Sequence, residues 1–267
     1  MRDIAVYTLF SSSEGNCVYV KNKTDEYLID CGVSARACDT ALKSAGSSLA
    51  NIKAVFVTHE HSDHIRGLDM VCKKFHVPVY APAECCIAIA KQSVHASPFL
   101  NALEMNDPVA LGDVQITPFP TPHDSIASCG FVFDLDGVRF GLATDMGYVT
   151  KTTARALTGC RAVIIESNHD IQMLKNGTYP ENLKRRILSD HGHLSNESCA
   201  AFVPYLAHCG SVSLVLAHLS PHNNTPRAAF QASFESLTSF GAKVCAELGE
   251  GDVRLAVAPK CGICKVL

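Results

Sequence analysis

Short apolar runs alternate with polar segments along most of the chain. In its first part, the runs that predict β-strands are residues 5–10, 17–20, 27–29, 54–58 and 77–80. Helical spacing of apolar positions predicts helices over residues 34–45, from the end of the strand at 54–58 to about residue 75, and over 83–92. Ser34 suits the N-cap of the first helix, and Gly46 lies just past its end.

The middle of the chain changes from this alternation to consecutive strands. Residues 114–119, 130–135 and 138–143 predict antiparallel strands, and Asp136-Gly137 predicts a two-residue hairpin turn between the last two. Alternation then returns, with strands over 162–166, 213–217 and 254–258 and helices over 181–189, 196–207 and 226–240. Two β-rich halves, each closed by helices, predict two sheets that face each other with the helices outside.

A histidine-rich segment follows the strand predicted at 54–58. It reads His59-Glu60-His61-Ser62-Asp63-His64, and imidazole and carboxylate groups are ligands that suit zinc, iron or manganese. Residues i and i+2 of an extended segment share a face, so His59 and His61 are expected to bind one metal. Asp63 and His64 begin the next turn and are expected to face a second metal. The pattern predicts a two-metal hydrolase site, where bound water becomes hydroxide near neutral pH.

Further candidate ligands stand at the ends of other predicted strands. His123 follows the strand at 114–119, Asp145 follows 138–143 and His218 follows 213–217. A scaffold holds side chains most firmly at such positions. We assign His59, His61 and His123 to the first metal and Asp63, His64 and His218 to the second, with Asp145 bridging the two.

Asp30 ends the strand at 27–29, and two interpretations stay open for it. Its carboxylate could accept an N–H from a ligand histidine and so fix that ring's tautomer. Alternatively it forms the turn before Gly32.

This constellation resembles the metallo-β-lactamase superfamily, whose motifs appear here in order: Asp30; His59, His61, Asp63 and His64; His123; Asp145; His218. The resemblance implies an α/β fold, an αββα sandwich of two mixed β-sheets flanked by helices, in one domain over residues 1–267. It also argues against a flavodiiron oxygen reductase, which would carry a glutamate where His61 stands.

A finer resemblance is to the YycJ/WalJ group of that superfamily. The segments that carry it are Ser11-Ser12-Ser13-Glu14-Gly15-Asn16, Glu166-Ser167-Asn168-His169-Asp170, Gly192-His193-Leu194-Ser195-Asn196 and Asn223-Asn224-Thr225-Pro226. Ser12 replaces the group's usual glycine, and His222 stands where many members have an acidic residue. The resemblance implies a 5′-directed exonuclease acting on double-stranded DNA.

Residues outside the ligand set are expected to contact a phosphodiester. Ser11, Ser13 and Asn16 place hydroxyl, amide and backbone N–H groups in one turn, either as a phosphate-binding nest or as a polar hairpin turn. The substrate-binding candidates beyond this turn are Asn168, His169, His193 and Asn223.

Two residues are assigned catalytic roles. Asp63 is expected to orient the metal-bound water and take up its proton. His193 precedes Ser195, a good N-cap, and is expected to bind a phosphate or to protonate the leaving oxygen; otherwise it packs at the helix entry. His191 and His222 are expected to be surface residues.

Composition narrows the alternatives. With 47% hydrophobic and 18% charged residues the chain can bury a full core, and its net charge of −3 offers no strong basic field for nucleic acid. The chain shows neither a signal-peptide pattern nor a membrane-spanning apolar run, and its 13 cysteines are expected to be reduced thiols in a cytoplasm. Cys261 and Cys264 lack the second pair that a structural zinc site needs, so we interpret their spacing as coincidence.

Two rival functions remain. A hydrolase of a cyclic phosphodiester, lactone or thioester would need a closed apolar pocket, whereas a nuclease needs an open groove lined by Arg or Lys. Lys184-Arg185-Arg186 is a candidate wall of such a groove, or else a solvated helix face. A regulatory or scaffold protein with an incidental metal centre is disfavoured by the complete ligand set.

Overall fold

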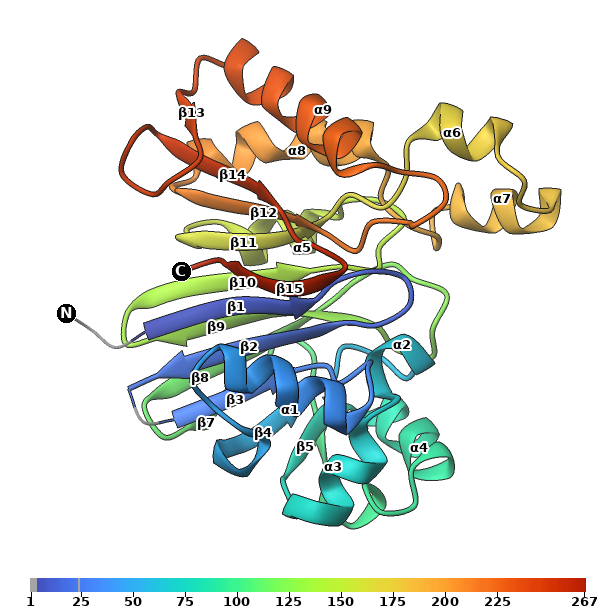
Figure 1. Ribbon diagram of the computed structural model, residues 1–267, viewed down its shortest axis with the longest axis vertical. Coiled ribbons are helices and arrows are strands. Elements are labelled where there is room, and N and C mark those ends of the chain that lie inside the picture. The colour runs from blue at the N-terminus through green and yellow to red at the C-terminus, as the bar shows by residue number, and fades with distance from the viewer. Residues whose placement is uncertain (1–3, 24) are drawn as a thin grey trace.

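The computed structural model describes residues 4–23 and 25–267, and its strands form two sheets that face each other (Figure 1). In sheet order, the first sheet consists of β15 (Cys261–Lys265), β1 (Ile4–Phe10), β2 (Cys17–Asn22), β3 (Asp25–Ile29), β4 (Ile52–Phe56), β5 (Val79–Pro82) and β6 (Leu100–Leu103). The second consists of β13 (Val244–Cys245), β14 (Val253–Val257), β12 (Ser213–Ala217), β11 (Ala162–Glu166), β10 (Val138–Ala143), β9 (Cys129–Leu135), β8 (Val114–Pro120) and β7 (Val109–Leu111).

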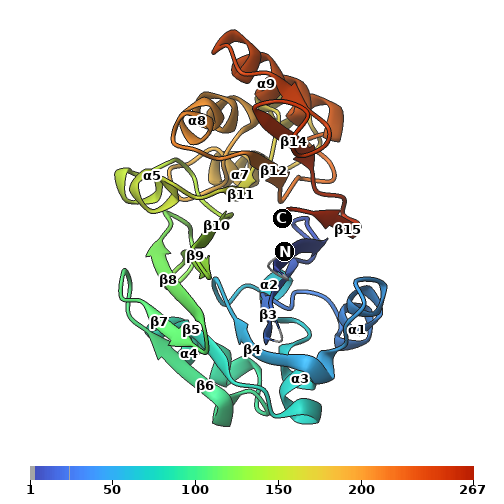
Figure 2. The same ribbon diagram turned by 90° about the vertical axis from the view of Figure 1, so that its left-hand side faces the viewer.

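Helices cover both outer faces of this sandwich. The first sheet is covered by α1 (Ala35–Ser44), α3 (Leu68–Phe75) and α4 (Ala83–Gln92), with 3-10 turns η1 (Leu49–Asn51) and η2 (Ser97–Phe99). The second is covered by α5 (Lys151–Leu157), α8 (Asn196–His208) and α9 (Pro226–Ser239). Figure 2 shows α1 and α5 on opposite outer sides. Three short helices, α2 (Ser62–Ile65), α6 (Ile171–Asn176) and α7 (Glu181–Ile187), lie at the right-hand end in Figure 1. No helix within the described residues is long and apolar enough to cross a bilayer.

The central strands are largely apolar because both of their faces are covered. In β4, Phe56 points into the core between the sheets, whereas Val55 packs under the helices of the first sheet. In β11, Ile164 faces the central core and Ile165 the helices of the second sheet. Successive strand residues point to opposite faces, so a strand buried on both sides is a continuous apolar run.

Strand direction brings several loops to one end of the sandwich. In the first sheet β3 and β4 are parallel, and β1 runs in the same direction because it is antiparallel to β2. In the second sheet β10, β11 and β12 are parallel, and β8 shares their direction through antiparallel β9. The carboxyl ends of all these strands therefore lie at the same end, which Figure 1 shows on the right with α2 and α7.

The two mixed sheets with outer helices confirm the predicted architecture. Ser34 caps α1 by accepting from the Ala37 N–H, and Gly46 follows the helix with φ of 79°. Asp136 and Gly137 both have positive φ, as the predicted hairpin turn requires.

Several elements were not expected from the sequence: β6, β7, β13, β15, α5 and α6. The helix predicted to end near Phe75 is two helices, α2 and α3, on either side of Gly67. Gly67 lies so close to the chain at Val33 that a Cβ there would come within 2.2 Å of the Val33 carbonyl oxygen.

Candidate metal centre

The candidate ligands come together because each follows the carboxyl end of a strand at the shared end of the sandwich. The strands and the residues that follow them are β3 with Asp30, β4 with His59, His61, Asp63 and His64, β8 with His123, β10 with Asp145, and β12 with His218. The first two strands belong to one sheet and the last three to the other. The site is therefore assembled across the two layers.

Three of these histidines form a first cluster. His59, His61 and His123 each offer one ring nitrogen within 4.8 Å of the others. His59 Nδ1 lies 3.0 Å from Thr58 Oγ1, and His123 Nδ1 lies 3.0 Å from the Gly192 carbonyl oxygen. A proton on His123 Nδ1, donated to that carbonyl, leaves the lone pair of Nε2 free for a cation. Burial lowers the pKa of both His59 and His123, which favours the neutral, ligating ring.

Asp63, His64 and His218 form a second cluster, again within 4.8 Å of one another. Asp63 Oδ2 lies 3.4 Å from His64 Nε2 and 3.6 Å from His218 Nε2. Asp30 Oδ2 lies 2.8 Å from His64 Nδ1, and its other oxygen accepts the Thr58 N–H at 2.8 Å. Asp30 is thus placed to fix the His64 ring, in agreement with the first of the two interpretations offered for it.

Asp145 lies between the two clusters. Its Oδ2 is 3.5 Å from His64 Nε2, and its Oδ1 is 3.6 Å from His218 Nε2 and 3.9 Å from His123 Nε2. The side chain is 2% exposed, so it has little access to water. One carboxylate therefore faces histidines of both clusters, the position that a bridging ligand requires.

Buried atoms without hydrogen-bond partners indicate that the clusters suit metal ions. Three buried atoms that point into them have no hydrogen-bond partner: His59 Nε2, Asp145 Oδ2 and His218 Nε2. A buried polar atom without a partner costs about 1–3 kcal/mol, and cations bound by these atoms would remove that cost. The donor set of imidazoles and carboxylates suits zinc, manganese or iron. The residues present therefore fit a dinuclear metal centre.

Backbone strain accompanies this arrangement. Asp30, Asp145 and His218 have φ of 61°, 59° and 58°, the left-handed region that non-glycine residues seldom adopt. Tertiary contacts hold them there; for example, the His218 N–H donates to Ser11 Oγ at 2.8 Å. Such strain concentrates at functional sites because the surrounding structure must impose it.

Glu166 is a buried carboxylate at the end of β11 to which the sequence analysis assigned no role. Its Oε1 accepts from His193 Nδ1 at 2.8 Å and from His218 Nδ1 at 2.9 Å. Its Oε2 accepts the N–H groups of Met146 and Leu194. His193 and His218, which hold their protons toward it, lower the pKa of Glu166 despite its burial. The signal that could have found it is its place at a strand end, which it shares with the candidate ligands.

The polar side chains of the turn after β1 form more hydrogen bonds within the protein than the sequence suggested. Ser11 supports the His218 backbone, and the Asn16 amide lies 3.2 Å from His64 Nε2 and 3.4 Å from Asp63 Oδ2. The N–H groups of Ser12, Glu14, Gly15 and Asn16 all have acceptors within the protein. Ser13 is the exposed member of the predicted set, and its hydroxyl accepts from Asn168 Nδ2 at 3.4 Å.

Asn168, His169 and Asn223 are all buried. Asn168 Nδ2 donates to the His218 carbonyl oxygen at 2.9 Å, so its amide positions that residue. Both ring nitrogens of His169 and Nδ2 of Asn223 have no partner. Burial lowers the pKa of His169 to about 4, so its ring is neutral at pH 7. His191 and His222 are exposed, as expected.

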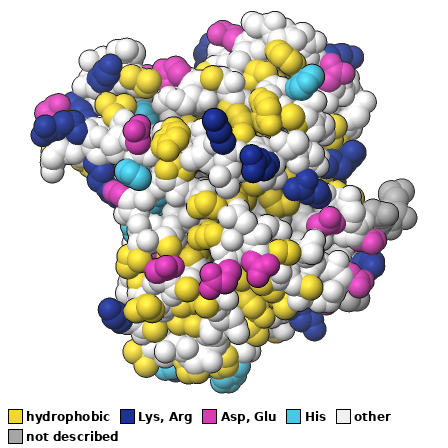
Figure 3. Space-filling view, turned by 180° about the vertical axis from the view of Figure 1, so that it is seen from behind, with side chains coloured by type: hydrophobic (Ala, Val, Ile, Leu, Met, Phe, Trp, Pro, Cys, Tyr) yellow, Lys and Arg dark blue, Asp and Glu magenta, His cyan; other side chains and the backbone are white. Residues whose placement is uncertain are grey.

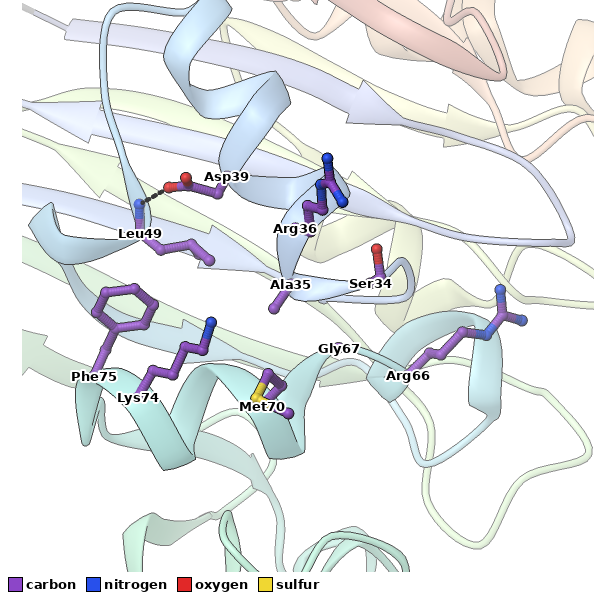
Figure 4. Close-up of a pocket in the computed structure, with 10 residues that line it drawn as sticks. All are labelled: Ser34, Ala35, Arg36, Asp39, Leu49, Arg66, Gly67, Met70, Lys74 and Phe75. Atoms are coloured by element: carbon purple, nitrogen blue, oxygen red, sulfur yellow. Dashed lines mark hydrogen bonds between the residues drawn. The ribbon is translucent and has the colours of Figure 1, made fainter.

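The cavity drawn in Figure 4 lies apart from these clusters, between α1 and α3. It measures about 500 Å³, and it is lined by Ser34, Ala35, Arg36, Asp39, Leu49, Arg66, Gly67, Met70, Lys74 and Phe75. None of these residues belongs to the clusters. Arg66, at its edge, donates to the Glu14 carbonyl oxygen of the polar turn at 3.1 Å.

Cys261 and Cys264 lie on the edge strand β15. Cys261 is exposed beside α1, whereas Cys264 packs against the core between the sheets. The two thiols thus have different surroundings, and neither belongs to a group of potential metal ligands within the described residues.

A family model for the β-lactamase superfamily domain matches residues 26–219. The chain belongs to the metallo-β-lactamase superfamily. Among curated members it is 32% identical over 250 residues to an exodeoxyribonuclease, YycJ of Bacillus anthracis, covering 92% of this chain and 95% of that one. It is also 32% identical over 246 residues to the exodeoxyribonuclease WalJ of Streptococcus pneumoniae, covering 91% and 89%.

A solved member of the superfamily has the same fold. The metallo-β-lactamase fold protein YhfI of Bacillus subtilis superimposes with a TM-score of 0.71 at 15% identity, covering 98% of this chain and all of that one. The two sheets with outer helices described above are thus the metallo-β-lactamase fold, and the resemblance in the motifs extends to the YycJ/WalJ group.

Proposed function

We propose that this metallo-β-lactamase-fold hydrolase is a two-metal phosphodiesterase that removes nucleotides from the 5′ end of DNA. The observation that carries the proposal is the pair of three-residue clusters with Asp145 between them. Two metals a few ångströms apart form a clamp for in-line displacement at phosphorus. The choice of DNA rests on the two exodeoxyribonucleases that match more than nine-tenths of the chain.

In this proposal each cluster binds one of the two metals, as the sequence suggested. His59, His61 and His123 would hold the first metal, Asp63, His64 and His218 would hold the second, and Asp145 would be the ligand that they share. When bound, the metals supply a hydroxide near neutral pH and offset the negative charge that develops at phosphorus. Their identity is zinc, manganese or iron, and availability decides among them.

Asp63 orients the attacking water and accepts its proton. Its Oδ2 faces both His64 and His218, and Asn16 Nδ2 lies 3.4 Å from the same oxygen. The neighbouring histidines lower the pKa of Asp63 although burial opposes them, so the carboxylate is ionised at neutral pH and accepts a hydrogen bond from the attacking water.

His193 donates a proton to the leaving oxygen. The Nδ1–H donates to Glu166 at 2.8 Å, so the proton that passes to the leaving oxygen is a second one, carried on Nε2. The ring is 5.0 Å from His123 and 5.3 Å from His218, measured between centroids, so it borders both clusters. A group in this position is within reach of a phosphodiester bound to the metals.

Substrate phosphates are bound by Ser13, His169 and Asn223, with Ser11, Asn16 and Asn168 holding the surrounding loops. The support for His169 and Asn223 is that their buried nitrogens lack partners in the protein. A phosphate oxygen would accept from Asn223 Nδ2 and from the one protonated ring nitrogen of His169. We further propose that residues 1–267 act as one domain in the cytoplasm, where the thirteen free cysteines would stay reduced.

The proposal is tested with a 5′-phosphorylated, 3′-labelled DNA duplex and metal-reconstituted protein. We expect stepwise release of 5′ nucleotides with manganese rather than magnesium alone. Turnover of Asp63→Ala should fall by about 10²–10⁴-fold, the range for loss of a proton-transfer group. His191→Ala changes an exposed histidine outside the clusters and serves as the matched control.

Full activity of Asp63→Ala would refute the role given to this carboxylate. Intact DNA, from wild-type protein shown by elemental analysis to hold two metals, would refute the DNA substrate. The assay would then move to small cyclic phosphodiesters, lactones and thioesters, the alternative class for this fold.

A further inference from the structure

The segment that carries α6 and α7 lies at the end of the sandwich that also holds α2 (Figure 1), and basic residues occur on both of its helices. Figure 3 shows Lys and Arg side chains gathered on this projecting region, at the upper left of that view. The residues are Lys175 near the end of α6 and Lys184, Arg185 and Arg186 on α7. In a chain of net charge −3, such local cations decide where a polyanion binds.

The three basic residues of α7 have different surroundings. Lys184 Nζ donates to the Lys175 carbonyl oxygen at 2.8 Å and to Glu181 Oε1 at 3.0 Å, so this cation is engaged within the projecting segment. Arg185 is exposed. Arg186 instead contacts Asp124, the residue that follows His123.

Asp124 fixes the Arg186 guanidinium beside the first cluster. Arg186 Nε donates to Asp124 Oδ2, and Nη2 donates to Oδ1 at 3.0 Å. Asp124 Oδ1 in turn lies 3.4 Å from His123 Nε2, the atom that faces the cluster. A two-bond contact of this kind sets the orientation of the guanidinium plane as well as its position.

The contact with Asp124 leaves most of the guanidinium available. An arginine has five N–H donors, and two of them are used here. No further acceptor for Arg186 occurs within residues 4–23 and 25–267, and its side chain is 50% exposed. The remaining donors suit the paired oxygens of a phosphate, which arginine binds with two parallel hydrogen bonds.

We propose that Arg186 binds a backbone phosphate of the DNA next to the linkage that is cleaved, and so makes the enzyme select polynucleotides over small phosphodiesters. The inference rests on the proposed function and adds a specificity-determining residue to it. Lys184, by contrast, does not bind the DNA in this proposal, because its ammonium group is hydrogen-bonded to the Lys175 carbonyl oxygen and to Glu181.

A purely structural role for Arg186 makes different predictions. If the contact only anchors α7 to the loop after β8, loss of either partner has the same effect, since both ends of an anchor are needed. If Arg186 binds phosphate, loss of Arg186 weakens DNA binding more than loss of Asp124 does. Asp124→Asn therefore serves as the matched variant.

The experiment measures binding of metal-loaded full-length protein to a fluorescent duplex with phosphorothioate terminal linkages, by anisotropy over a range of salt concentrations. For Arg186→Gln we expect about ten- to hundredfold weaker binding. The slope of log affinity against log salt should become shallower by about one, the signature of one lost phosphate contact. Asp124→Asn and Arg185→Gln should keep the wild-type slope.

Steady-state kinetics gives a second readout. With Arg186→Gln the ratio of kcat/KM on DNA to kcat/KM on bis(p-nitrophenyl) phosphate should fall about ten- to hundredfold, chiefly through KM on DNA. The small ester has no neighbouring phosphate for Arg186 to bind. An unchanged ratio together with an unchanged salt slope would overturn the inference.

Other outcomes separate the inference from the function it rests on. Wild-type protein that binds the duplex but does not cleave DNA refutes the exonuclease proposal, while the salt slopes still decide the role of Arg186. Equal loss of slope in Arg185→Gln would show a diffuse basic face instead of a specific contact and would overturn the inference. Loss of bound metal in both Arg186→Gln and Asp124→Asn, with the wild-type slope kept, would establish the anchor role.

Discussion

The two clusters of the candidate centre differ in the groups that surround their histidines. In the first, His59 has other imidazoles as neighbours, and burial lowers its pKa and that of His123. In the second, burial alone would lower the pKa of His64 and His218, but carboxylates outweigh it. Asp30, Asp145 and Asp63 raise the pKa of His64, and Asp145, Asp63 and Glu166 raise that of His218 to about 10.

This difference separates two ways of building a metal site. In the first cluster, burial favours the neutral rings of His59 and His123, so a cation binds these two without displacing protons. The second keeps protons on its imidazoles in the metal-free protein, where they balance the surrounding carboxylates. Metal entry there must expel those protons, so the affinity of the second cluster should rise with pH more steeply than that of the first.

The largest effect is expected from Asp145, because it faces both clusters. Asp145→Asn removes a negative charge while an asparagine still tolerates the left-handed backbone. We expect loss of metal from both clusters and a fall in turnover of about 10²–10³-fold or more. Elemental analysis and the DNA assay measure both, with the exposed Asp107→Asn as control. Loss of a single metal would place Asp145 in one cluster.

A change at Asp30 should affect the second cluster alone. Asp30→Asn removes the charged acceptor of His64 Nδ1, and loss of such a partner lowers metal affinity by about 10–100-fold. Competition with a chromophoric chelator should show one weakened site and one unchanged site. Asp69 also lies 2.8 Å from a histidine, His95, but on the surface, so Asp69→Asn is the control. Equal weakening of both sites would contradict the separation of the clusters.

The smallest effect is expected from pH, which should change the melting temperature of the metal-free protein. The pKa of His218 is about 10 in the folded state and about 6.5 when unfolded. A raised folded pKa contributes stability that is fully present below pH 6.5 and is lost as pH rises toward 10. The melting temperature of chelator-treated protein should therefore fall by several degrees between about pH 6.5 and 8.5, at about 2–4 °C per kcal/mol.

Two comparisons check this pH prediction. Metal-loaded protein, in which His218 binds a cation instead of a proton, should lack the fall. His218→Asn should show a smaller fall when metal-free, since it removes one of the two imidazoles with a raised pKa, the other being His64, while asparagine tolerates the backbone there. A metal-free melting temperature that is flat over this range would contradict the raised pKa.

Much of the fold and of the cluster could be predicted from the sequence because both follow from local patterns. The runs ending near His59, His123, Asp145 and His218 are buried strands, so the residue at each strand end had a predictable environment. To predict that these strand ends come together, only the directions of the strands were needed. The alternation of strands and helices constrains those directions. Whether these residues bind metal as assigned stays a prediction.

The parts that escaped prediction depend on contacts between distant segments. Glu166 matters because His193 and His218 reach it from elsewhere in the chain. Arg186 differs from its neighbour Arg185 only through its contact with Asp124. Likewise, the sequence around Ser11 and Asn16 did not show that their side chains contact His218 and His64 within the protein.

The pairing of β15 with β1 has a consequence for how the molecule forms. These strands come from opposite ends of the described chain, and the Ser11 N–H, in the turn that supports His218, donates to the Lys260 carbonyl oxygen beside β15. Contacts between such distant segments are slow to form, since the entropy of closing a long loop comes first. During synthesis, the edge of β1 that pairs with β15 stays unpaired until β15 has been made. We therefore expect completion of the polar turn after β1, which supports His218, to be among the last events of folding.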